Sequence, residues 1–218
     1  MLLSRPTKYG SGILLYGDYY DLRNIHETIH ALLQGAPLES KFEDLILGLA
    51  HDIRKAYEGE REKLSLGFDP VDRVKYRGVK ILWPYFLVEL GLLRWSAGFH
   101  PTTREQQANL YRLEACAEIA LISYDPEAGR DAIEWLARFS GLPTTYLPEF
   151  ITEVNLRYAS SFKAGKDRFR QLPRILRMID PLTNEYKVFE KRLHDQAKKL
   201  NCSPLDLQFG GNFPRIKW

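Results

Sequence analysis

The sequence predicts a mainly α fold of the α+β class, a single helical domain with an N-terminal β-hairpin. Hydrophobic residues make up 44% of the 218 residues and charged residues 27%, a balance that favours a folded chain with a buried core. From residue 22 onward, apolar residues recur mainly at intervals of three and four, the period of a helix with one buried face. The first 20 residues instead hold two short apolar runs separated by glycines, which is typical of a hairpin.

The two runs of the predicted hairpin are Leu2 to Thr7 and Ile13 to Tyr16. Gly10 and Gly12 lie between them, and glycine permits the positive φ angles that a tight reversal requires. The hairpin is therefore expected to occupy residues 1–20 and to pack against the side of the helical domain.

In the remainder of the chain, the apolar period and the residues typical of helix starts and ends predict about seven helices. Gly35 and Pro37 are expected to end the first helix, and Gly141 and Pro143 to end the fourth. The predicted helices cover Leu22 to Leu33, Phe42 to Tyr57, Arg104 to Ser123, a segment beginning at Asp125, a segment after Pro148, and Asn184 to Leu200.

Two segments break this periodic pattern. Residues 59–75 are rich in charge and turn formers, including Gly67 and the pair Asp69-Pro70, and predict an exposed connection. Residues Val79 to Leu93 are apolar nearly all round and predict an element enclosed by others. The core is expected around four large side chains, Trp83, Phe86, Leu90 and Trp135.

One short motif has a chemical meaning. His26-Glu27-Thr28-Ile29-His30 resembles the His-Glu-x-x-His signature of zincin metallopeptidases. On a helix, residues four apart lie one turn above each other, so His26 and His30 can bind one Zn²⁺ while Glu27 acts as general base. A third ligand would come from His51 or Asp52, or from Glu114 or Glu118 further on.

The context of the motif favours a simpler interpretation. About 24 residues precede it, enough for one hairpin but not for the multistranded sheet that zincins place before their active helix. The resemblance covers five residues, and we favour the interpretation that His26 and His30 are ordinary helix residues. A zinc-dependent hydrolase remains the main alternative function, with zinc as its only implied cofactor.

The C-terminal part, residues 151–218, is expected to be basic and helical, with 14 basic and seven acidic side chains against a net charge of +3 for the whole chain. Such a segment can neutralise phosphates, or it can dock an acidic protein surface. Nucleic-acid association is therefore a second alternative function. The candidate binding residues are Lys163, Lys166, Arg168, Arg170, Arg174 and Arg177.

The compartment is predicted from what the sequence lacks. It shows no run of roughly 20 apolar residues and no secretory leader, so we expect no membrane association. Cys116 and Cys202 lie far apart and form no Cys-x-x-Cys pair, which favours a reducing compartment, the cytoplasm.

Three short stretches resemble an uncharacterised bacterial protein family, of the kind classed as domains of unknown function. They are Pro6 to Gly10, Leu15 to Tyr19, and Thr28 to His30. The resemblance implies a bacterial origin and an intracellular location, and it assigns no catalytic residue. Our leading functional hypothesis is therefore a non-catalytic interaction or regulatory protein that binds a protein partner or associates with itself.

Overall fold

The structure is a computed structural model, and it describes residues 1–66, 74–139, 144–160, 162–207 and 213–218. It is mainly helical, with a four-stranded antiparallel sheet built from the first third of the chain. The predicted α+β class is therefore confirmed. Within these described ranges, no helix combines the length and the apolar character that a membrane crossing requires.

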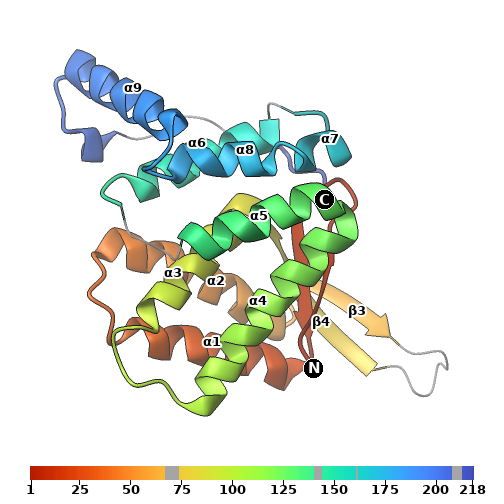
Figure 1. Cartoon of the computed structure of the whole chain (residues 1–218). Coiled ribbons are helices and arrows are strands. Elements are labelled where there is room, and N and C mark those ends of the chain that lie inside the picture. Colours follow the sequence, from red (N-terminus) through yellow and green to blue (C-terminus); the bar gives the residue numbers. More distant parts are fainter. Residues whose placement is uncertain (67–73, 140–143, 161, 208–212) are drawn as a thin grey trace.

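The predicted N-terminal hairpin is present, as part of a larger sheet. Strands β1 (Leu3–Pro6) and β2 (Gly12–Gly17) pair antiparallel, with Leu3 opposite Tyr16. The sheet continues through β4 (Val74–Leu82) to β3 (Glu62–Leu66), in the order β1-β2-β4-β3. Figure 1 shows the β3 and β4 arrows extending away from the helical body.

Two predictions for the middle of the chain are wrong. Residues 59–75 are not only a connection, because they contain β3 and the start of β4; Gly67 and Asp69-Pro70 lie outside the described residues. Likewise, Val79 to Leu93 is not one element, because the chain passes from β4 into helix α3 (Trp83–Ser96) at Trp83. A continuously apolar run has no period, so it cannot mark where strand becomes helix.

The helices follow the apolar period closely, and capping residues set several of their starts. Helix α1 begins after Asp18, whose carboxylate accepts a hydrogen bond from the backbone of Asp21 in a capping box. The ends predicted at Gly141 and Pro143 lie outside the described residues. The helical elements are α1 (Tyr19–Leu33), α2 (Ser40–Tyr57), α3, α4 (Arg104–Tyr124), α5 (Pro126–Phe139), α6 (Leu147–Ser160), α7 (Lys166–Phe169), α8 (Leu172–Leu176), the 3-10 turn η1 (Arg177–Ile179), α9 (Asn184–Leu200) and the 3-10 turn η2 (Pro204–Asp206).

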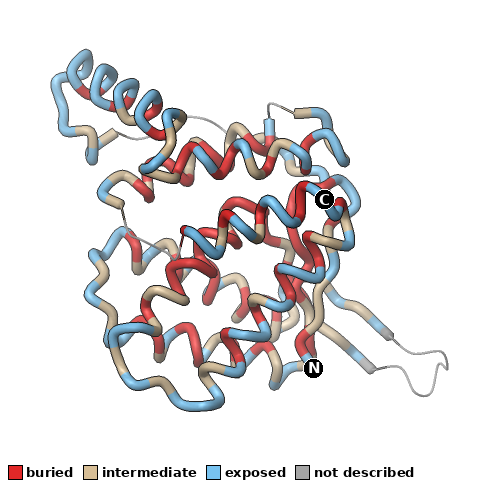
Figure 2. Tube along the Cα trace, viewed as in Figure 1, coloured by how far each residue is buried: buried red, intermediate tan, exposed pale blue. Residues whose placement is uncertain are grey.

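Helix α3 forms the centre of the molecule. It contacts α1, α2, α4, α5, α6 and α8 as well as strands β2 and β4, which explains why its sequence is apolar on every side. Trp83, Phe86, Leu90 and Trp135 are all buried, as the sequence predicted. In Figures 1 and 2, helices α6, α8 and α9 lie along one side of the body, and α9 exposes its outer face.

The turn of the first hairpin, residues 7–12, joins the N-terminal sheet to helices from the second half of the chain. The buried Tyr158 hydroxyl of α6 donates a hydrogen bond of 2.5 Å to the carbonyl oxygen of Gly10. The Tyr124 hydroxyl of α4 donates one of 3.2 Å to the carbonyl oxygen of Lys8. Gly10 has a φ of +66°, a conformation that favours glycine.

Arg168 of α7 reaches the same turn from the C-terminal side. Its buried guanidinium donates to the hydroxyl of Ser11 at 2.7 Å and to the carbonyl oxygens of Ala159 and Phe162 at 3.0 and 3.3 Å. The Ser11 hydroxyl in turn donates to the carbonyl oxygen of Lys217 at 2.6 Å. Burying a charge is costly unless it is hydrogen-bonded, so the bonds from the two terminal nitrogens, Nη1 and Nη2, fix the position of Arg168.

The pairing of β2 with β4 predicts a sharp contrast between two glycine variants. Gly12→Ala should lower the free energy of unfolding by at least about 3 kcal/mol, because its Cβ would clash with the backbone carbonyl of Ile81. Gly48 lies on α2 with open space around it, so Gly48→Ala should raise stability by about 0.5–1 kcal/mol. Urea unfolding measures both; a Gly12→Ala protein as stable as wild type contradicts the register.

Candidate functional site

The two histidines of the His-Glu-x-x-His motif face each other on the outer side of α1. Their Nε2 atoms are 3.2 Å apart and their ring centroids 4.5 Å apart. The ring of His26 also meets Tyr57 of α2 edge-on, at 5.7 Å between centroids. His30 is exposed and His26 is half-buried. The spacing of four residues therefore brings the imidazoles together, as helix geometry requires.

The separation of the two imidazole nitrogens is compatible with a shared metal ion. Two nitrogens bound to one tetrahedral Zn²⁺ at about 2.0–2.1 Å lie about 3.3 Å from each other. Within the described part of the chain, however, no group of three or more His, Cys, Asp or Glu side chains is placed to hold a metal ion. The histidine pair therefore offers two protein ligands and no third.

The proposed general base and the side chains considered as third metal ligands are engaged elsewhere or lie on the surface. The proposed general base, Glu27, is 55% exposed and forms an ion pair with Arg23 of its own helix at 2.8 Å. Nothing encloses its carboxylate, as a catalytic base would require. The four candidates for the third ligand are no better placed. His51 contacts Arg54, Asp52 pairs with Arg61 and Glu114 pairs with Arg94. Glu118 is exposed.

The surroundings of His26 favour its neutral form. Burial is the main cause that lowers its pKa from the ordinary value, and the nearby charges of His30 and Arg54 lower it further. A neutral imidazole is the form that can accept a hydrogen bond or bind a metal ion.

Two of the six basic candidate residues are engaged within the fold. Arg168 is buried beneath the surface, bonded to the hairpin turn. Arg170 forms an ion pair of 2.9 Å with the buried carboxylate of Asp125, at the start of α5. The six residues therefore do not form one continuous basic strip.

The other four basic candidates are exposed and lie in two places. Lys163 precedes α7 and Lys166 begins it; between them, the backbone N–H of Gly165 donates to the carbonyl oxygen of Tyr9 in the hairpin turn. Arg174 and Arg177 belong to α8 and η1, and each borders a different hollow. Arg174 and Arg177 are therefore each placed beside a concave surface.

The hollow that contains Arg174, which we call the arginine groove, has a volume of about 590 Å³ and lies between α6, α8 with η1, and α9. Arg157 and Arg192 join Arg174 along it, and Glu185 is its only carboxylate. Apart from Asn184, the other lining side chains are apolar. The lining residues are Arg157, Phe162, Arg174, Ile175, Met178, Asn184, Glu185, Val188, Phe189 and Arg192.

The three arginines of the groove have few competing partners. Arg174 forms no ion pair within the described residues, and Arg192 lies over the ring of Phe189 at 5.5 Å. Arg157 meets Glu153 of its own helix at 3.4 Å. Arg174 and Arg192 can therefore pair with an incoming carboxylate, whereas Arg157 is already held by Glu153.

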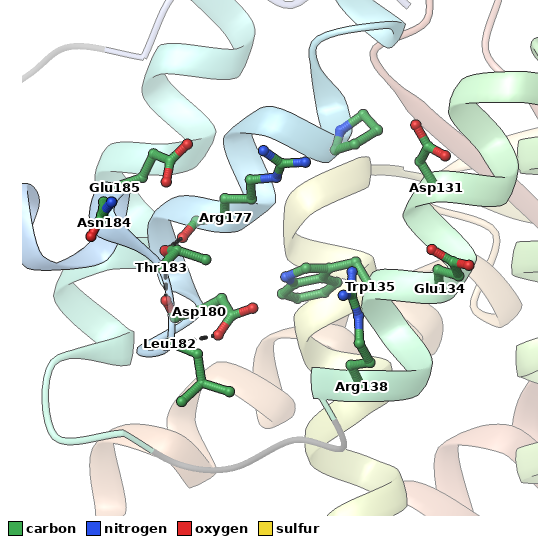
Figure 3. Close-up of a pocket in the computed structure, with 11 residues that line it drawn as sticks. Asp131, Glu134, Trp135, Arg138, Arg177, Asp180, Leu182, Thr183, Asn184 and Glu185 are labelled. Carbon is green, nitrogen blue, oxygen red and sulfur yellow. Dashed lines mark hydrogen bonds between the residues drawn. The ribbon is translucent and has the colours of Figure 1, made fainter.

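The hollow that contains Arg177 is different in charge. It has a volume of about 500 Å³ and lies between α5 and the segment from η1 to α9, as Figure 3 shows. Arg138 and Arg177 are its cations, and the indole Nε1 of Trp135 has no hydrogen-bond partner in the described part of the chain. Four carboxylates oppose these donors, so this hollow does not favour an anion; they belong to Asp131, Glu134, Asp180 and Glu185.

Sequence reasoning missed Arg157 and Arg192 as candidate residues. Both lie on helices, outside the short basic run, where a lone arginine is typical of a solvated face. Only the packing of α9 on α6, through Phe189 against Phe150 at 4.3 Å between centroids, brings them to Arg174. No local signal in the sequence indicates that contact.

The causes of the lowered His26 pKa predict how neighbouring variants change it. His30→Ala should raise the pKa of His26 because it removes a nearby positive charge, and Glu27→Gln should lower it because Glu27 favours the protonated form. NMR titration of the His26 ring measures both. His194→Ala, on the distant helix α9, serves as the control and should leave the titration unchanged; equal titration in all three variants contradicts this electrostatic account.

The comparisons with known proteins give a family and no activity. The sequence matches the family described as Domain of unknown function (DUF6904) over residues 2–218, nearly the whole chain. No curated protein and no solved structure matches it. The resemblance to an uncharacterised family is thus confirmed, and the chain belongs to the DUF6904 family.

Proposed function

We propose that this protein is a non-catalytic interaction protein of the bacterial cytoplasm, which binds an acidic, partly apolar segment of a protein partner in the arginine groove. The observation that carries the proposal is the charge of the groove, whose lining holds Arg157, Arg174 and Arg192 against one carboxylate, Glu185, with Glu153 beyond the lining as a partner of Arg157 alone. Surfaces of complementary charge attract each other and reject partners of like charge.

The apolar side chains around the groove favour a peptide over a small inorganic anion. Met178 and Phe189 of the groove are already buried, but Val188 of α9 is 60% exposed and Phe162 is partly exposed. These two side chains gain free energy when a partner covers them. A segment that alternates carboxylates with apolar residues satisfies both the arginines and these side chains.

A nucleic acid fits this surface less well. Of the six basic residues first considered, Arg168 is buried and Arg170 is paired with Asp125, so the phosphate-binding strip is interrupted. The described residues match no nucleic-acid-binding motif that we recognise. Binding to an oligonucleotide is therefore the competing outcome of the test that follows.

A charge-reversal experiment tests the groove. A fluorescein-labelled peptide in which glutamates alternate with leucine and phenylalanine should bind the wild-type protein, and added salt should weaken the binding. The double variant Arg174→Glu, Arg192→Glu should weaken binding at least about tenfold, measured by fluorescence anisotropy. The matched control reverses Arg104 and Arg112, two exposed arginines of α4, and should bind as wild type does.

Two results contradict the proposal. One is equal affinity of the groove variant and the α4 control for the acidic peptide. The other is tighter binding of a single-stranded oligonucleotide than of the peptide, which would assign the basic surface to nucleic acid. A peptide with lysine in place of glutamate should not bind, and it separates charge recognition from apolar adhesion.

Metal binding at the histidine pair is a second candidate function, supported by the separation of 3.2 Å between the Nε2 atoms of His26 and His30. A site with two protein ligands leaves the other coordination positions to water or to a partner. We propose metal binding here without peptide hydrolysis, because the exposed Glu27 is paired with Arg23.

Calorimetry with Zn²⁺ and Ni²⁺, together with a peptide-cleavage assay, distinguishes metal binding alone from zincin catalysis. His26→Ala and His30→Ala should each weaken binding at least about tenfold, whereas Glu27→Gln should retain it. His194→Ala, which alters an exposed histidine of α9, is the control. Undiminished binding in both α1 histidine variants contradicts the metal site, and zinc-dependent peptide cleavage that is lost in Glu27→Gln would establish zincin chemistry instead.

A further inference from the structure

A third hollow, of about 410 Å³, lies between α2, the end of β4 and the start of α3. Asp44, Gly48 and Asp52 border it from α2, where a spacing of four residues places them along one face. Gly48 in the middle has no side chain and no atom within 4 Å of the place that a Cβ would take, which helps to keep the hollow open.

Glu89 of α3 lines this hollow and is the most unusual group in it. The residue is only 5% exposed, and no described residue forms a hydrogen bond with its Oε2 atom. Burial raises the pKa of Glu89 well above the ordinary value, and the nearby charge of Asp52 raises it further. Leaving a buried polar group without a partner costs stability, so a donor that reaches Glu89 gains a strong hydrogen bond.

The cations already present are engaged with other carboxylates. Lys80 of β4 forms an ion pair of 2.9 Å with Glu62, and Arg61 pairs with Asp52 at 2.6 Å. Asp44 forms no ion pair within the described residues. The hollow therefore contains two carboxyl groups, on Asp44 and Glu89, that have no cationic partner among the residues that the structure describes.

The other walls indicate the kind of cation that fits. The rings of Tyr85 and Trp218 and the side chain of Ile81 line the hollow, and aromatic rings attract ammonium groups. A metal ion is a poor fit, because the described residues hold no group of three carboxylate, imidazole or thiolate ligands placed for one. An organic cation can use both the carboxyl groups and the aromatic walls.

We propose that this hollow is a binding site for the primary ammonium group of a small organic amine. The unpartnered carboxyl of Glu89 accepts a hydrogen bond from the ammonium at the base of the hollow. Asp44 attracts the cation at the entrance, and Tyr85 and Trp218 cover its carbon chain. This site lies apart from the arginine groove, so the proposal does not depend on the function assigned to that groove.

Calorimetry with 1,4-diaminobutane tests the proposal on the full chain. We expect binding with a dissociation constant of about 1 mM or tighter, and no binding of 1-butanol, which has a similar shape but no charge. Glu89→Gln keeps the size of the side chain and should weaken the amine at least about tenfold. Gly48→Leu, which fills the hollow from α2, should abolish binding.

A matched control shows whether Glu89 binds a ligand or is only a buried carboxyl group without a role in binding. Glu118→Gln removes an exposed carboxylate from α4 and should bind the amine as wild type does. Thermal unfolding of each variant confirms that it is folded. The proposal is overturned by absence of amine binding to the wild-type protein, by equal affinity of Glu89→Gln and Glu118→Gln, or by equal binding of 1-butanol.

Discussion

The fold depends on the hydrogen bonds that the first hairpin turn, residues 7–12, accepts from distant helices. Tyr124, Tyr158 and Arg168 all reach this turn, and the guanidinium of Arg168 also bonds the backbone that follows α6. The carbonyl oxygens of a turn are not all paired by the strands that it connects, so those that are buried need donors from elsewhere in the fold. The N-terminal sheet and the C-terminal helices are thereby joined at one place.

This junction determines which cations remain available on the surface. It removes Arg168 from the basic run, while the pairing with Asp125 occupies Arg170. The exposed cations that border concave surfaces lie further along, where α9 packs on α6. Two hollows there have similar volumes but differ in charge. The arginine groove has more cations than carboxylates, whereas the hollow with Arg177 has more carboxylates than cations, so the groove suits an acidic partner better.

Local features of the sequence predicted much of the fold, whereas the candidate sites depend on contacts between distant residues. The apolar period located the main helices, and the four-residue spacing of His26 and His30 predicted their contact. The burial of Arg168 could not be predicted, because its acceptors include Ser11 at the other end of the chain. Glu89 looks like one polar interruption in an apolar run, and only the packing of α2 on α3 leaves it unpartnered.

Mapping a bound acidic peptide by NMR tests the account most directly. The Nε–Hε resonances of arginine side chains report which guanidinium groups meet an added carboxylate, without any change to the protein. The account predicts that the signals of Arg157, Arg174 and Arg192 shift together and saturably, while those of Arg104 and Arg112 stay in place. Unchanged signals of Arg157, Arg174 and Arg192 at saturating peptide, with backbone amide shifts confined to Lys163, Lys166 and the hairpin turn, would contradict it.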